Sequence, residues 1–153
     1  IYPENDPLGS GYHILQSKIA VGSGGLMGKG YMASTQSQLN FLPEHHTDFA
    51  FSVLAEEWGF IGACLVILLL LAIVIRGLSV VRSSKNMFGS LVALGVVSMF
   101  FWQTCINIGM VSGLLPVVGV PLPFISYGGS SVVSSLLALG LLMNISMRRF
   151  LFR

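Results

Sequence analysis

Three long apolar segments constrain the fold of this chain more than any other feature. They cover roughly residues 49–75, 88–110 and 130–147. Each is close to the about 20 mainly apolar residues that a helix needs to cross the hydrocarbon core of a bilayer. Because backbone polar groups cannot stay unpaired in lipid, such segments cross as helices. The sequence therefore predicts an all-α polytopic membrane protein with three transmembrane helices within residues 48–153.

The composition agrees with a membrane protein. Charged residues make up 9% of the chain and hydrophobic residues 54%, whereas soluble domains carry about 25% charged residues. The cations form no basic stripe with interleaved aromatic residues, so we expect no nucleic-acid partner. Cys64 and Cys105 lie inside apolar segments and are interpreted as packing residues rather than a disulfide or a metal pair.

The cations predict an orientation, because Lys and Arg accumulate in short cytoplasmic loops. Lys18 and Lys29 precede the first apolar segment, and the other six of the eight cations follow the first or the third segment. Three spans put those six on one side, so we expect residues 1–47 to be extracytoplasmic and the C-terminus cytoplasmic. The chain begins with Ile1, and we expect it to be the C-terminal part of a larger bacterial inner-membrane protein.

The connection at residues 111–129 is unusual for an exposed loop. It has no charge, and it contains three prolines and four glycines, which are incompatible with a regular helix. Irregular backbone at membrane depth is tolerated only where it is buried in protein or lines a wet cavity. We therefore expect a re-entrant or broken segment that dips into the outer leaflet, with a tightly packed interhelical turn as the alternative.

Residues 1–47 are expected to form a long extracytoplasmic segment. Residues 12–21 place apolar side chains at helical spacing, which suits a short helix in the membrane interface. A cluster of glycines follows at residues 22–30, but it lacks the spacing of a Walker phosphate loop. We interpret it as a flexible turn whose backbone amides and Lys29 could meet an anionic head group, or alternatively as a plain hinge.

Four of the six acidic residues fall where polar sequence enters the first apolar segment, namely Glu44, Asp48, Glu56 and Glu57. Carboxylates at such a position are costly to desolvate, so they usually coordinate, pair or do chemistry. On a helix, Glu44 and Asp48 would share a face that Ser52 and Glu56 continue. Partial desolvation would make Asp48 a better proton acceptor.

Other interpretations of these polar residues remain open. Glu44, Asp48 and Glu56 could cap helices and pair with Lys18 or Lys29. A zinc site at His45 and His46 is disfavoured, because adjacent histidines on a helix point apart and no HExxH spacing exists. In the second apolar segment, Gln103 and Asn107 share a face and favour contacts between helices over substrate binding.

Four stretches of the chain resemble the SEDS family of membrane proteins. They are residues 36–49 (QSQLNFLPEHHTDF), 55–59 (AEEWG), 107–123 (NIGMVSGLLPVVGVPLP) and 126–130 (SYGGS). The chain is most similar to the rod-shape-determining members, and the division-type members are near relatives. The resemblance implies further transmembrane helices before this part of the chain, in agreement with the three spans above.

The resemblance also implies a reaction, the polymerisation of lipid II into peptidoglycan strands during cell elongation. The family's essential acid falls on Asp48, which would act as general base on the acceptor hydroxyl. The undecaprenyl pyrophosphate leaving group would need a cation, from Lys18, Lys29, the rest of the protein or a divalent metal such as Mg²⁺ or Mn²⁺ near Asp48 and Glu44. The resemblance gives supporting or substrate-contacting positions at Glu44, His46, Glu56 and Ser126.

The resemblance implies two kinds of partner, membrane lipid and a class B penicillin-binding protein that acts as transpeptidase. It also implies that the segment at residues 111–129 helps to line a groove for lipid tails. The competing interpretations are a lipid II flippase or another transporter, and a scaffold that would not need Asp48. A transporter should carry acids near mid-membrane. Here the acids crowd the expected outer edge.

Overall fold

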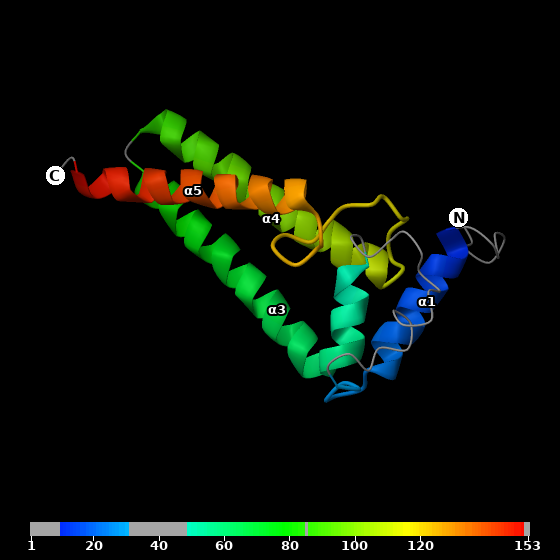
Figure 1. The fold of residues 1–153 in the computed structure, drawn as a ribbon. Coiled ribbons are helices and arrows are strands. Elements are labelled where there is room, and N and C mark those ends of the chain that lie inside the picture. The colour runs from blue at the N-terminus through cyan, green and yellow to red at the C-terminus, as the bar shows by residue number, and fades with distance from the viewer. Residues whose placement is uncertain (1–9, 31–48, 85, 152–153) are drawn as a thin grey trace.

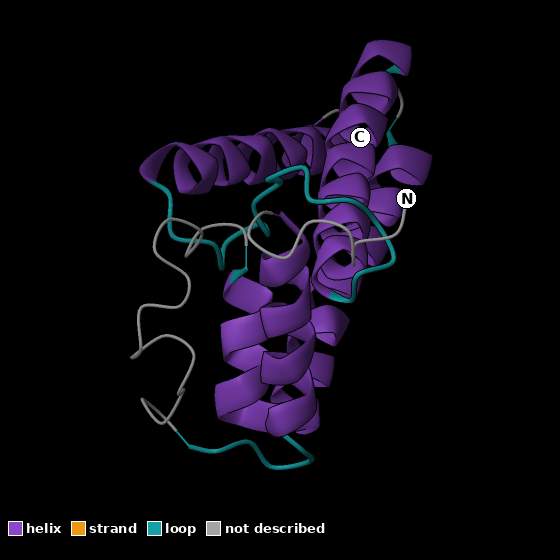
Figure 2. Ribbon diagram, turned by 90° about the vertical axis from the view of Figure 1, so that its right-hand side faces the viewer, coloured by secondary structure: helices purple, strands orange, loops and turns teal. Residues whose placement is uncertain are grey.

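The computed structural model describes residues 10–30, 49–84 and 86–151, and within these ranges the chain is all-helical (Figures 1 and 2). The helices are α1 (Ser10–Ser23), α3 (Ala50–Ser83), α4 (Met87–Val111) and α5 (Gly129–Leu151). Three of them are long and apolar enough to cross a membrane. The predicted fold class, an all-α membrane protein with three spans in this part of the chain, is therefore confirmed.

Helices α4 and α5 begin and end close to their expected bounds, but α3 is longer than expected. The sequence predicts a first span that ends near residue 75, whereas α3 continues through Arg76 to Ser83. Gly77 helps to explain the continuation: it packs so closely on Val97 of α4 that an added Cβ would contact the Val97 side chain. Arg76 and Arg82 therefore lie within α3 rather than in a loop.

Helix α3 changes direction at Gly59, a break that the sequence interpretation does not include. Gly59 has φ 67° and ψ −165°, which is not a helical conformation. Residues 50–58 therefore form a short first segment of α3, and residues 60–83 form the long one (Figure 1). Helix α1 lies beside the first segment, and α4 and α5 accompany the long one.

The core consists of two apolar clusters along the bundle. One joins both segments of α3 to the end of α4 through Phe51, Ala63 and Val111. The other joins the far part of α3 to α4 and α5 through Val74, Val97 and Leu142. The connection between α4 and α5 packs against both clusters, because Leu122 belongs to the first cluster and Phe124 contacts both.

Candidate functional site

The glycine-rich turn, residues 24–30, completes the backbone hydrogen bonding of α3 where the helix breaks. The N–H of Lys29 donates to the carbonyl of Glu56 at 3.0 Å, and the N–H of Gly30 donates to the carbonyl of Glu57 at 3.1 Å. These carbonyls precede Gly59, so the break would otherwise remove their partners in the helical ladder. The amides of the turn therefore take the place of the missing helical donors.

Two N–H groups beyond the break donate in the opposite direction. Phe60 donates to the carbonyl of Gly25 at 2.9 Å, and Ile61 donates to that of Leu26 at 3.3 Å. Backbone groups that are buried away from water need such partners, and in lipid an unpaired group costs several kcal/mol. We call the break in α3 together with this turn the Gly59 junction.

Close backbone contact explains why the turn is rich in glycine. A Cβ on Gly28 would contact the carbonyl oxygen of Glu57, and a Cβ on Gly59 would contact the nitrogen of Gly28. Gly28 (φ 78°) and Gly59 (φ 67°) also adopt the left-handed conformation that glycine accepts without strain. The interpretation that the backbone amides of this turn could meet an anionic head group is wrong for the amides of Lys29 and Gly30, because both already donate to α3.

An ion pair adds a side-chain contact to the Gly59 junction. The Lys29 Nζ lies 2.7 Å from Oε1 of Glu56, whose side chain is 0% exposed, and the Lys29 side chain is 32% exposed. The hydroxyl of Ser23 also lies 3.5 Å from the same carboxylate oxygen. The structure thus favours the alternative in which Glu56 pairs with Lys29.

The first segment of α3 is held on its other turns as well. Ser52, which is buried on the same face as Glu56, donates its hydroxyl to the carbonyl of Phe49 at 2.7 Å. Helix α1 is tied to the end of α4, where the hydroxyl of Ser17 donates to the carbonyl of Val111 at 3.0 Å. Phe49 itself is 1% exposed. The start of α3 is therefore packed and hydrogen-bonded from its first residue.

The connection between α4 and α5 folds back along the bundle. The amide of Asn107 donates to the carbonyl of Val120 at 2.7 Å, which ties the connection to α4. The ring of Phe124 lies 5.6 Å from that of Phe100, centroid to centroid. Since Phe100 precedes the end of α4 by eleven residues, the connection reaches back about 16 Å along the helix axis. Its depth in a membrane stays a prediction.

Ser126 and Asn107 take structural positions in this connection. The hydroxyl of Ser126 accepts a hydrogen bond from the N–H of Leu122 at 2.7 Å, and the Ser126 residue is 2% exposed. Asn107 links α4 to the connection rather than to another helix, and the expected contact of Gln103 between helices stays a prediction. Contact between Ser126 and a substrate stays a prediction.

The central acidic prediction lies outside the described residues. Asp48, Glu44 and His46 fall in the range 31–48, and so does the divalent cation expected near the two acids. Lys18 is exposed and has no salt bridge to any residue within the described ranges. Within those ranges no group of three or more His, Cys, Asp and Glu side chains could hold a metal ion.

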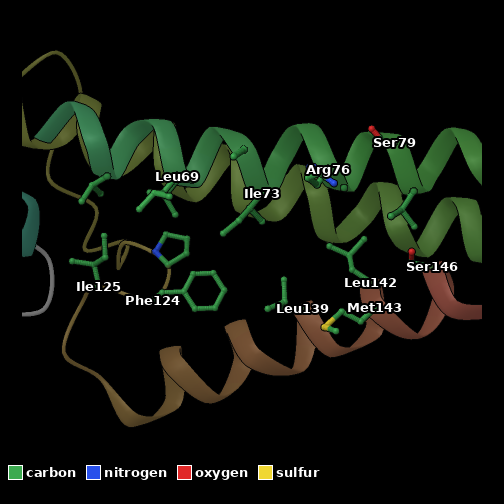
Figure 3. A pocket seen from close by; sticks show the side chains of 16 residues that line it. Leu69, Ile73, Arg76, Ser79, Phe124, Ile125, Leu139, Leu142, Met143 and Ser146 are labelled. Carbon is green, nitrogen blue, oxygen red and sulfur yellow. The ribbon is translucent and has the colours of Figure 1, made fainter. Parts of the chain in front are cut away.

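An apolar groove of about 760 Å³ runs between α3 and α5 (Figure 3). Leu69 and Ile73 of α3 line one wall, and Leu139 and Met143 of α5 line the other. The α4–α5 connection closes one end with Phe124 and its neighbours. A groove with this lining suits a hydrocarbon chain, and the binding of a lipid tail there stays a prediction.

The ion pair predicts an asymmetric response to mutation. Lys29→Met would remove the cation that lies 2.7 Å from the buried Glu56 carboxylate and should destabilise the protein by about 3–5 kcal/mol. Glu56→Gln should cost less, because water reaches the partly exposed Lys29 ammonium. The double variant should be more stable than Lys29→Met alone. Unfolding of the purified full-length protein in detergent measures all three.

Lys18→Met is the matched control, since Lys18 is exposed and has no salt bridge within the described ranges. Its stability should stay within about 0.5 kcal/mol of the parent protein. Equal destabilisation by Lys29→Met and Lys18→Met would contradict a stabilising role for the ion pair.

Comparison with known families gives one match over almost the whole chain. The family model for FtsW, RodA and SpoVE, described as cell cycle protein, matches residues 1–150. Peptidoglycan glycosyltransferase MrdB of Escherichia coli K12 is 53% identical over 147 residues, which are 96% of this chain and 40% of the relative. Stage V sporulation protein E of Bacillus subtilis is 49% identical over 144 residues, 94% of this chain and 39% of the relative.

A further relative and a solved structure agree with this match. Peptidoglycan glycosyltransferase RodA of Treponema pallidum is 47% identical over 147 residues, 96% of this chain and 34% of the relative. The solved structure is described as "Structural coordination of polymerization and crosslinking by a peptidoglycan synthase complex". One of its chains superposes with a TM-score of 0.79 at 30% identity, over 97% of this chain and 39% of that one. The chain thus spans 40% or less of the length of these proteins.

Proposed function

The chain belongs to the FtsW, RodA and SpoVE family of cell cycle proteins, and from this membership we propose that the protein containing it is a peptidoglycan glycosyltransferase of the elongation type. The observation that carries the proposal is the 53% identity over 96% of the chain to MrdB, a protein named for that activity. The substrate in this proposal is lipid II, and the products are a lengthened glycan strand and undecaprenyl pyrophosphate.

Asp48 is the residue that we propose as general base. The acceptor sugar's hydroxyl oxygen attacks the anomeric carbon of the donor, and the Asp48 carboxylate takes the hydroxyl proton. The bond from the anomeric carbon to the pyrophosphate oxygen breaks, and the pyrophosphate leaves with the electron pair. A cation near the leaving group would stabilise this charge, and a divalent ion held by Asp48 and Glu44 is one proposed source.

The described residues support this role through the segment that follows Asp48. Phe49 is the next residue, and it is 1% exposed. Two turns later Glu56 pairs with Lys29, and the Gly59 junction fixes the direction of the segment. A packed, hydrogen-bonded helix start next to the base would help to hold the base in position, which favours catalysis. We therefore assign Lys29 and Glu56 to positioning rather than to contact with the leaving group.

Two partners follow from the proposed function. The apolar groove between α3 and α5 suits the hydrocarbon tail of a membrane lipid. A class B penicillin-binding protein would crosslink the new strands, and the structural relative belongs to a complex described by polymerization and crosslinking.

The proposed orientation places the Gly59 junction outside the cytoplasm and the α3–α4 connection inside. Met27 (84% exposed) and Ser83 (exposed) are suitable positions for a test, because neither carries a contact of the junction. In a full-length protein with the other cysteines removed, a membrane-impermeant maleimide should label Met27→Cys in intact cells and spare Ser83→Cys. Labelling of Ser83→Cys alone would invert the topology.

Polymerisation of purified lipid II by the full-length protein with its transpeptidase tests the function directly. Long glycan strands should form when the transpeptidase active site is blocked, since polymerisation does not need crosslinking. The break in α3 and the buried Glu56 also suit a transporter. Movement of lipid II across vesicles without strand formation would favour a flippase and would overturn the enzyme proposal.

A further inference from the structure

A second, polar cavity lies between α4, α5 and the connection that joins them. Its volume is about 360 Å³, within the lower part of the range for small-ligand sites. Gln103 of α4 and a row of serines from the first two turns of α5 line it, and the connection adds residues 121–123. The serines are Ser130, Ser131, Ser134 and Ser135.

Within the described residues, Ser135 presents an unpaired hydroxyl to this cavity. The residue is 4% exposed and lines the cavity, yet its hydroxyl forms no hydrogen bond to any other described residue. Ser131 and Ser134 differ, because their hydroxyls donate to the carbonyls of Gly128 and Ser131. A hydroxyl that faces a cavity and has no partner in the described protein is free to donate to, or accept from, a group that enters the cavity.

The lining favours an anion as that missing partner. Ser130 and Ser131 lie in the first turn of α5, where N–H groups have no intrahelical acceptor and the helix dipole is positive. The hydroxyls and the Gln103 amide add further donors, and no carboxylate is among the described residues that line the cavity. Neutral donors at a helix N-terminus are a common way to bind phosphate oxygens.

The position of the cavity favours a phosphate that is attached to a lipid. Pro123 lines both this polar cavity and the apolar groove between α3 and α5. A polar site and an apolar groove that share a wall match an amphiphile with an anionic head and a hydrocarbon chain. A free phosphate would use only the polar cavity.

We propose that the polar cavity binds the diphosphate of a polyprenyl diphosphate, and that the apolar groove takes the adjoining part of its chain. The inference rests on the proposed function, in which such a diphosphate leaves when the glycosidic bond forms. Ser135, Ser130 and Gln103 would donate to its oxygens as the electron pair moves onto them. This assignment differs from the expectation drawn from the family resemblance, which gave the leaving group to Lys18, Lys29, the rest of the protein or a divalent metal.

The test measures binding by the full-length protein in nanodiscs, so it does not depend on turnover. The probes are farnesyl diphosphate, inorganic pyrophosphate and farnesol. Removing two donors to a charged group in Ser130→Ala/Ser135→Ala should weaken farnesyl diphosphate binding at least about tenfold, which corresponds to 1.4 kcal/mol. Farnesol binding should not change, and pyrophosphate should bind the parent protein more weakly than farnesyl diphosphate.

Ser98→Ala on α4 is the matched control, because Ser98 is exposed and lies outside the lining of the cavity. Ser135→Asp is a second variant, which should abolish farnesyl diphosphate binding by charge repulsion while farnesol still binds. An unchanged affinity in the double variant would overturn the proposal, and so would an equal loss for farnesol or in Ser98→Ala. If binding responds as expected but lipid II is not polymerised, the proposed function fails and the site stands.

Discussion

Gly28→Ala is expected to prevent stable assembly of the Gly59 junction. The new Cβ would clash with the Glu57 carbonyl oxygen. No side-chain rotamer change can relieve this clash, because the Cβ is fixed to the turn backbone and the oxygen belongs to the backbone of α3. The turn would have to leave α3, which would unpair the four hydrogen bonds that link them. Each buried group left unpaired costs about 1–3 kcal/mol. We expect a loss on the order of 4 kcal/mol or more, seen as little folded protein in membranes and a much lower Tm.

Alanine substitutions at two other glycines should destabilise the protein progressively less than Gly28→Ala. Gly25 has φ 55° but open space around its Cβ position, so Gly25→Ala should cost only the left-handed backbone strain of about 1–2 kcal/mol. Gly22 lies in α1 with open space and no unusual φ, so Gly22→Ala should be neutral or slightly stabilising. Equal stability of the Gly28 and Gly22 variants would show that the junction does not need the close contact.

The membrane spans could be predicted because their cause is local. A run of apolar residues long enough to cross a bilayer leaves the chain few alternatives to a helix, so α4 and α5 agree with the expected bounds to within a few residues. The α3–α4 connection could not be delimited in the same way. The cations after residue 75 favour a loop, whereas α3 continues to Ser83 and packs through Gly77 on Val97 of the next helix, a contact that the sequence does not show.

The Gly59 junction could not be predicted because its parts are about thirty residues apart in the sequence. From the sequence alone, Gly59 is expected to be an ordinary helix residue, and the glycines in residues 22–30 are expected to form a flexible turn. Their structural role depends on contact between the backbone of the turn and the broken helix. The sequence did offer one signal, because a glycine-rich turn and the isolated Gly59 lie on the two sides of the acidic cluster.

The candidate site was predicted in part. The Lys29–Glu56 ion pair was one of the two alternatives weighed, and the spacing that puts Ser52 and Glu56 on one buried face is borne out by their burial. The unpartnered Ser135 could not be recognised, because burial of a serine in an apolar helix depends on what the α4–α5 connection covers.

Asp48→Asn is expected to abolish most of the polymerase activity while the protein stays folded. The amide keeps the shape and hydrogen-bonding capacity of the side chain but cannot take the proton of the acceptor hydroxyl. General base catalysis typically contributes about 10²–10⁴-fold, so lipid II turnover should fall by roughly that factor. The measurement is turnover by the purified full-length variant with its transpeptidase, and the unchanged Tm and complex formation are the checks on folding.

Glu56→Gln separates chemistry from positioning in the same assay. Glu56 is buried against Lys29 in the Gly59 junction, so its loss should act through the geometry of α3 and cost less activity than Asp48→Asn. Lys29→Met should also lose activity through instability, and the double variant Lys29→Met/Glu56→Gln, which is more stable, should recover part of that activity, whereas no stabilising change should rescue Asp48→Asn. If Asp48→Asn polymerises normally while Glu56→Gln is inactive at unchanged stability, the base is Glu56. If both polymerise normally, the base lies in the part of the protein that precedes this chain.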